Sequence, residues 1–155
     1  MQLTLAVVGK PRHPSLAAAI EDYETRAARY WALDVHEVKE EPARGGVTDT
    51  IVRKREGDRL LARIGSGKRL VACVVGGDRY TSEEFAGWLV RERDSARSIA
   101  FAIGGAYGLS EAVLAEATGT LSLAPWTLPH ELSRLVLAEQ LYRAGSILRR
   151  EPYHK

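Results

Sequence analysis

Short apolar segments alternate with longer segments of helical periodicity along the chain of 155 residues. Residues 3–9 form a β-branched apolar run that ends in glycine, which is typical of a buried strand. In residues 15–31, apolar side chains recur instead at helical spacing. The apolar runs in residues 68–76 and 98–103 are continuous, as in strands that are buried on both faces. This alternation predicts an α/β fold, a mostly parallel sheet with helices on both faces.

The remaining segments continue the same alternation. Thr81 and Glu84 match a capping box, which predicts a helix from there to about Asp94. Pro42 and two adjacent glycines predict a loop over residues 41–48. The other expected elements are a weaker strand at 34–39, helices at about 50–64 and 110–117, a last strand at 120–124 and a last helix at about 129–149. Because no repeat or change in composition divides the chain, we expect one domain over residues 1–155.

Charge and cysteine content narrow the classes of protein that need to be considered. The net charge is only +2, so the molecule as a whole is not a polycation. Cys73 is the only cysteine, which excludes an intrachain disulfide and fits a reducing compartment. The four histidines have no metal-ligand spacing, and no apolar run approaches the length of a membrane span. We expect a cytoplasmic protein that binds neither a metal nor a membrane.

Three predicted strands end in glycines or in an apolar loop, at positions 75–77, 103–105 and 124–127. Open parallel sheets bind ligands at the carboxyl ends of their strands, so the three ends together favour a ligand cleft over three unrelated tight turns. The first strand is not followed by a dinucleotide fingerprint, and residues 65–68 precede a strand, where a phosphate loop would follow one. Residues 125–129 offer apolar walls that suit an adenine-like ring, but they fit a plain strand-to-helix connection equally well.

The C-terminal segment combines a packed helix with a polar tail. Five basic residues follow position 133 against two acids, which fits either an anionic partner or a solvated helix face; the basic residues are Arg134, Arg143, Arg149, Arg150 and Lys155. His130 lies in the first helical turn, where the helix dipole disfavours its protonation. Since Cys73 sits inside a buried strand, nucleophilic catalysis is not favoured.

Three motifs together carry a family resemblance. They are Phe101-Ala-Ile-Gly-Gly-Ala-Tyr-Gly-Leu-Ser110, Leu121-Ser-Leu-Ala-Pro-Trp-Thr-Leu-Pro-His130, and Glu139-Gln-Leu-Tyr-Arg143 with Pro152-Tyr-His154. The chain closely resembles the RlmH family, small SPOUT-class methyltransferases that act on a pseudouridine in 23S ribosomal RNA. The resemblance implies a C-terminal trefoil knot, S-adenosylmethionine as methyl donor, and a homodimer whose active site is completed across the interface.

The resemblance also implies roles for individual residues. Arg143, Tyr153 and His154 would face the target nucleotide, where His154 or water takes the N3 proton and Arg143 stabilises negative charge on the base. A structured target such as an assembled ribosome is expected. A knotted transfer RNA methyltransferase and a non-enzymatic ribosome-binding factor are the alternatives. The cofactor contacts would be Cys73, Gly104, Leu123, Ala124, Pro125, Trp126, Thr127 and Leu128.

Overall fold

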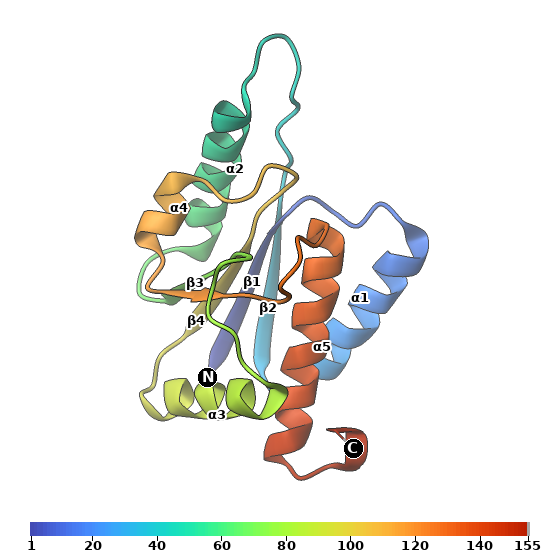
Figure 1. The fold of residues 1–155 in the computed structure, drawn as a ribbon. Coiled ribbons are helices and arrows are strands. Elements are labelled where there is room, and N and C mark those ends of the chain that lie inside the picture. The colour runs from blue at the N-terminus through green and yellow to red at the C-terminus, as the bar shows by residue number, and fades with distance from the viewer. Residues whose placement is uncertain (155) are drawn as a thin grey trace.

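A computed structural model describes the backbone of residues 1–154 and the side chains of residues 1–153. Within this part of the chain, five strands form one sheet in the order β2-β1-β4-β3-β5, and all neighbouring strands are parallel. Figure 1 shows the sheet with the helices around it. The strands are β1 (Gln2–Val8), β2 (Ala32–Val38), β3 (Arg69–Cys73), β4 (Ile99–Ile103) and β5 (Gly119–Leu121).

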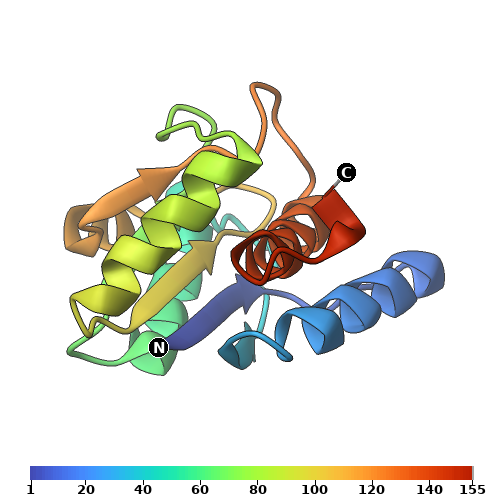
Figure 2. The same cartoon turned by 90° about the horizontal axis from the view of Figure 1, so that it is seen from below.

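Helices cover both faces of this sheet, as the alternating pattern predicted (Figures 1 and 2). Side chains of β1 alternate between the two faces: Leu3 and Leu5 join one buried cluster, and Ala6 joins another. The first cluster includes residues of α1 (Pro14–Ala27), α3 (Ser82–Asp94) and α5 (His130–Leu148). The second includes residues of α2 (Asp49–Ile64) and α4 (Glu111–Glu116). The α/β class and the two-sided coverage are therefore confirmed.

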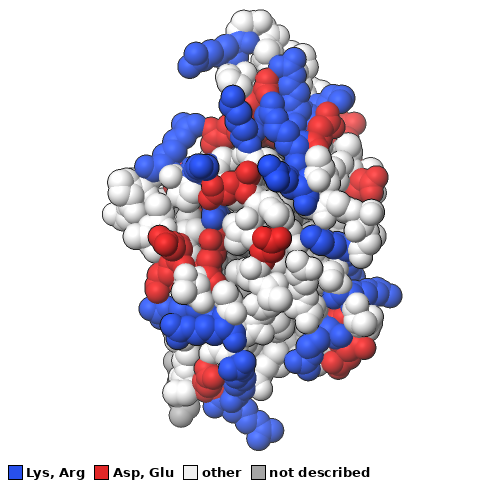
Figure 3. All heavy atoms as spheres, turned by 180° about the vertical axis from the view of Figure 1, so that it is seen from behind, with Lys and Arg blue, Asp and Glu red and all other residues white. Residues whose placement is uncertain are grey.

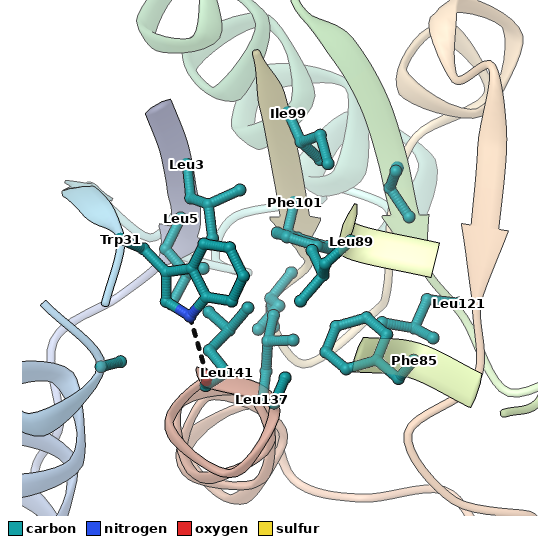
Figure 4. Close-up of a cluster of buried hydrophobic side chains, with 14 of the residues drawn as sticks. Leu3, Leu5, Trp31, Phe85, Leu89, Ile99, Phe101, Leu121, Leu137 and Leu141 are labelled. Carbon is teal, nitrogen blue, oxygen red and sulfur yellow. Dashed lines mark hydrogen bonds between the residues drawn. The ribbon is translucent and has the colours of Figure 1, made fainter. Parts of the chain in front are cut away.

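The larger of the two clusters anchors the C-terminal helix to the sheet (Figure 4). Leu137 and Leu141 of α5 are fully buried against Phe101 of β4. Trp31 is also buried there, and its Nε1 donates a hydrogen bond of 2.8 Å to the backbone oxygen of Leu141. This bond satisfies the polar atom that a buried tryptophan brings into the core. It also fixes where α5 lies over the sheet.

Most predicted boundaries agree with the structure to within a few residues, and the capping box at Thr81 and Glu84 is present. Two boundaries differ because of contacts with segments that are distant in the sequence. The helix α1 ends at Ala27 because the chain then turns to bring Trp31 into the core. The strand β5 ends at Leu121, since the backbone N–H of Ser122 already donates to the oxygen of Asp78 at 2.8 Å. None of the helices in residues 1–154 has the length and apolarity needed to cross a bilayer.

Candidate functional site

A pocket of about 590 Å³ opens at the carboxyl ends of β3 and β4. Three segments line it: the end of β3 with the two residues after it, the glycine-rich turn after β4, and the loop that leads from β5 into α5. These are the strand ends at which the sequence predicted a ligand cleft. Seven of the eight predicted cofactor contacts line the pocket, and Pro125 does not. The seven are Cys73, Gly104, Leu123, Ala124, Trp126, Thr127 and Leu128.

The glycines of the second segment allow the turn to fold back on itself. A Cβ atom at Gly104 would lie 2.5 Å from the carbonyl carbon of Gly108, closer than real contacts permit. Gly108 has a φ of 83°, and its N–H donates to the oxygen of Gly105 at 3.0 Å. The need for glycine at position 104 therefore comes from the geometry of the turn itself.

The third segment supplies an apolar wall and backbone groups that lie outside regular secondary structure. Residues 123–128 belong to no helix or strand, so their N–H and C=O groups take no part in regular secondary structure. Trp126 is 76% exposed, which is unusual for so large an apolar side chain. Val75 and Tyr107 are exposed as well, on the other segments around the pocket. This combination can hold a flat ring by apolar contact and by main-chain hydrogen bonds.

Cys73 is a wall of this pocket rather than a nucleophile. Burial raises the pKa of its thiol to about 12, so almost none of it is thiolate at neutral pH. The described residues also contain no cluster of three or more His, Cys, Asp or Glu side chains that would hold a metal ion.

The predicted substrate residues form a second cluster near the end of α5. Nη2 of Arg143 donates to Oε1 of Glu139 at 2.7 Å, and this bond raises the pKa of Arg143 above its ordinary value. The hydroxyl of Tyr153 donates to the same carboxylate oxygen at 3.1 Å. The ring centres of Tyr142 and Tyr153 are 4.4 Å apart. The polar tail therefore packs against the helix through Tyr153.

His154 and Lys155 are described only in part or not at all. His154 closes a short 3-10 helix, η1 (Pro152–His154), but its side chain lies outside the described residues. Lys155 lies outside them entirely. The predicted role of His154 therefore stays a prediction, whereas the neighbouring Tyr153 has a defined position. Burial, the main cause, raises the pKa of Tyr153, which keeps its hydroxyl protonated at neutral pH.

Within one chain, the pocket and the substrate cluster lie apart. The pocket reaches Ser133 in the first turn of α5, and Arg143 lies ten residues further along the same helix. A helix rises about 1.5 Å per residue, so the two positions are separated by roughly 15 Å. The residues that line the pocket and the cluster at Arg143 are therefore two separate groups within one chain.

Arg134 corrects the interpretation of the basic C-terminal segment. It is 6% exposed, and its guanidinium donates to Glu24 at 2.6 Å and to Glu37 at 2.7 Å. These two acids lie about a hundred positions away in sequence, so only the fold brings them together. Arg134 therefore ties α5 to α1 and β2 and is not available to an anionic partner. From the sequence alone, the buried Arg134 could not be told apart from the exposed arginines of the same basic segment.

Sequence reasoning also missed a buried polar group beside the pocket. His130 lines the pocket, and its buried Nε2 has no hydrogen-bond partner among the described residues. The nearest carboxylate oxygen in an ion-pair arrangement belongs to Glu40, at 3.6 Å.

Glu56 is 3% exposed and accepts a hydrogen bond from the N–H of Glu41 at 2.9 Å. Burial raises the pKa of Glu56, and no local motif in the sequence signals this.

Comparison with known proteins decides the family. Residues 1–154 match the family described as predicted SPOUT methyltransferases. The chain belongs to the SPOUT methyltransferase family. It is therefore an enzyme of the methyltransferase class, and the family resemblance that the sequence motifs carried is confirmed. In open α/β sheets, ligands bind at the carboxyl ends of the strands, which is where this pocket lies.

Several relatives within this SPOUT group are similar over their whole length. The chain is 59% identical over 155 residues to Ribosomal RNA large subunit methyltransferase H of Gemmatimonas aurantiaca, and the match covers all of both chains. It is 44% identical over 155 residues to the protein of the same name from Anaeromyxobacter sp. strain Fw109-5, again covering both chains fully.

Solved structures of more distant proteins share the fold. A probable methyltransferase from Bordetella pertussis Tohama I superimposes with a TM-score of 0.55 at 15% identity, covering 92% of this chain and 95% of that one. TrmJ from Z. mobilis ZM4 superimposes with a TM-score of 0.50 at 15% identity, covering 93% and 70% respectively. At these identities the likeness concerns the arrangement of strands and helices alone.

Proposed function

We propose that the protein transfers a methyl group from S-adenosylmethionine to N3 of a pseudouridine in 23S ribosomal RNA. The observation that carries this proposal is the 59% identity, over both full chains, to a relative named Ribosomal RNA large subunit methyltransferase H. We further infer that residues 1–155 act as one domain, in the cytoplasm, on RNA within an assembled ribosomal particle.

The pocket suits the proposed cofactor. Leu123 and Leu128 provide apolar walls, and the irregular backbone between them offers hydrogen-bonding groups to an adenine ring. The buried Nε2 of His130 adds a polar group at the pocket wall. When bound, S-adenosylmethionine supplies an already activated methyl group, so positioning accounts for much of the catalysis required of the protein.

The proposed chemistry on the RNA side belongs to the cluster at the end of α5. Transfer would break the bond between the methyl carbon and the sulfonium sulfur of the donor and form a bond from that carbon to N3. N3 loses its proton in this step, and we assign that proton to His154 or to water. Negative charge on the base oxygens is stabilised by Arg143, whose pairing with Glu139 keeps it charged and oriented. Tyr153 offers a protonated hydroxyl and an aromatic face to the base.

The separation of the two clusters supports a homodimer. Because the pocket and Arg143 are roughly 15 Å apart along α5, a second copy would be needed to place one chain's tail over the other's pocket. The exposed Trp126 at the pocket mouth offers apolar surface for such a contact. The active site would then combine the cofactor pocket of one subunit with Arg143, Tyr153 and His154 of its partner.

The proposed trefoil knot is supported by a close contact between two backbone segments. The N–H of Ser122 donates to the oxygen of Asp78 at 2.8 Å, which lays the chain after β5 against the loop after β3. A Cβ atom at Gly77 would lie 2.8 Å from the backbone of Leu121, so only glycine permits this approach. A chain that passes through its own loop requires close contacts of this kind, and the family resemblance implies such a knot.

Methyl transfer to defined RNAs tests the proposed function. The protein is incubated with labelled S-adenosylmethionine and, separately, with whole ribosomes, naked ribosomal RNA and transfer RNA. We expect label in 23S RNA, highest with the assembled particle. Label in transfer RNA alone would overturn the substrate, and absence of calorimetric binding of S-adenosylmethionine would point to a non-enzymatic factor.

The two C-terminal side chains are tested separately. His154→Ala should slow transfer while leaving the dissociation constant for S-adenosylmethionine unchanged; unaltered turnover would remove His154 from the mechanism. Tyr153→Phe keeps the ring packed on Tyr142 and removes only the hydroxyl that bonds Glu139, so slower transfer by this variant would assign a role to that hydroxyl.

A further inference from the structure

A second groove, of about 710 Å³, lies at the carboxyl ends of β1 and β2. Its walls are residues 9–12, which follow β1, and residues 37–44, which end β2 and begin the loop to α2. It therefore opens at the same edge of the sheet as the cofactor pocket. None of the roles proposed above uses it.

The carboxylates that line this groove are all engaged by arginines. Glu37 pairs with the buried Arg134 at 2.7 Å, and Glu40 pairs with Arg12. Glu41 accepts from Arg55 at 2.6 Å and also from Arg59 on α2. The negative charge of the groove is thus largely neutralised from within the protein.

Three cations of the same groove have no such partner. Lys10, Lys39 and Arg44 line it and are exposed, and none makes an ion pair with another side chain in residues 1–153. Figure 3 shows Lys and Arg side chains gathered over the end of the molecule formed by the beginning of α2 and the loop before it. The groove therefore presents net positive charge in a molecule whose total is only +2.

The groove is joined to the cofactor pocket through the first turn of α5. The backbone N–H of Arg12 donates to Oε1 of Glu131 at 3.1 Å. Oε1 of Glu40 lies 3.6 Å from Nε2 of His130, and His130 lines the pocket. A polymer lying in the groove would thus pass close to the pocket in which the methyl donor is proposed to bind.

We propose that this groove binds the phosphate backbone of the substrate RNA beside the target nucleotide, through Lys10, Lys39 and Arg44. This inference rests on the proposed function, because it is RNA methylation that supplies the polyanionic partner. Phosphate contacts by Lys and Arg position a nucleic acid without reading its sequence. The groove would therefore set the register of the RNA strand, and the pocket and the partner's tail would act on the base.

Removal of the three charges tests the assignment. The variant K10A/K39A/R44A is compared with R63A/R91A/R97A, which removes three exposed arginines that line neither cavity. Each phosphate contact contributes about 0.7–0.9 to the slope of log affinity against log salt, so loss of three should lower the slope by about 2–3. We expect the KM for ribosomal particles to rise about tenfold or more in the groove variant at physiological salt. The dissociation constant for S-adenosylmethionine should stay that of the wild type.

A second measurement uses the wild-type protein, so its result does not depend on whether a variant folds. It follows the protection of lysine side chains from acetylation. Acetylation of Lys10 and Lys39 by an amine-reactive reagent should be suppressed by ribosomal particles, whereas that of Lys68 should not. Lys68 lies at the opposite edge of the sheet, where its Nζ donates to Thr4 at 2.9 Å. Equal labelling of Lys10 and Lys39 with and without particles would overturn the assignment, as would a groove variant that behaves like its control. If the wild type methylates no RNA, the proposed function fails instead.

Discussion

Replacing Gly145 by alanine should loosen the contact that holds the C-terminal tail. A Cβ atom at Gly145 would lie 2.2 Å from Cγ of Tyr30 and 2.6 Å from its Cβ. Ordinary contacts begin near 3.4 Å, so α5 and the chain after α1 must separate by about an ångström. Tyr30 cannot simply rotate away, because its ring packs on Tyr142 at 5.7 Å and its hydroxyl donates to Glu151.

The expected magnitude is the difference between two effects. Overpacking of a tight core costs about 1–3 kcal/mol, and a clash with an aromatic ring at 2.2 Å belongs at the upper end. Gly→Ala in a helix interior returns about 1 kcal/mol. The net loss is about 2 kcal/mol, which lowers the melting temperature of a chain of this size by about 4–8 °C.

Gly87→Ala in α3 is the matched control. A Cβ atom there would meet only the end of the Arg91 side chain, at 3.5 Å, so the helix-propensity gain of about 1 kcal/mol should appear alone. Thermal and denaturant unfolding of the two variants should therefore give opposite signs. Gly145→Ala should also lower kcat more than cofactor affinity, because Tyr30 contacts the tail and not the pocket. If Gly145→Ala is as stable as Gly87→Ala, the reasoning about this contact is refuted.

Three further predictions test burial elsewhere in the molecule. Gly57→Ala in α2 should destabilise by up to about 2 kcal/mol in denaturant unfolding, because its Cβ would lie 2.1 Å from Oγ of Ser110 and the helix-propensity gain offsets only about 1 kcal/mol of the overpacking cost; a stabilised variant would contradict this. Cys73, whose pKa is raised to about 12, should react with iodoacetamide at pH 8 far more slowly than glutathione does, as followed by mass spectrometry, and rapid alkylation would count against it. Burial raises the pKa of Glu56 above its ordinary 4.5, so its contribution to stability is fully present below that pH and is lost as pH rises through the raised value. Glu56→Gln should therefore be increasingly more stable than the wild type from pH 4.5 to 7, and parallel pH profiles would be evidence against the raised pKa.

Much of the fold follows from local sequence signals. Buried strands and amphipathic helices have distinct apolar periods, and the side chains of Thr81 and Glu84 define a helix start by their own hydrogen bonds. The strand order and the shortened β5 do not follow in this way. They depend on contacts such as that of Ser122 with Asp78, which join segments more than forty residues apart.

The position of the pocket follows from local sequence signals, whereas the contacts of individual site residues do not. Glycines and an apolar loop at strand ends mark the pocket, because parallel strands bring their carboxyl ends to one edge. The burial of Arg134 depends instead on acids of α1 and β2, and charge along the sequence gives no sign of it. The packing of Tyr153 on Tyr142 likewise needs the chain to reverse after α5. Roles for individual residues came from the family resemblance rather than from their chemistry alone.

The most direct test of the account is to map the transferred methyl group by mass spectrometry. Ribosomal particles are incubated with the protein and isotopically labelled S-adenosylmethionine, and the digested RNAs are then analysed nucleoside by nucleoside. We expect one labelled nucleoside, a pseudouridine of 23S RNA that carries the methyl group on N3. Label on any other nucleoside, or only in transfer RNA, would contradict it.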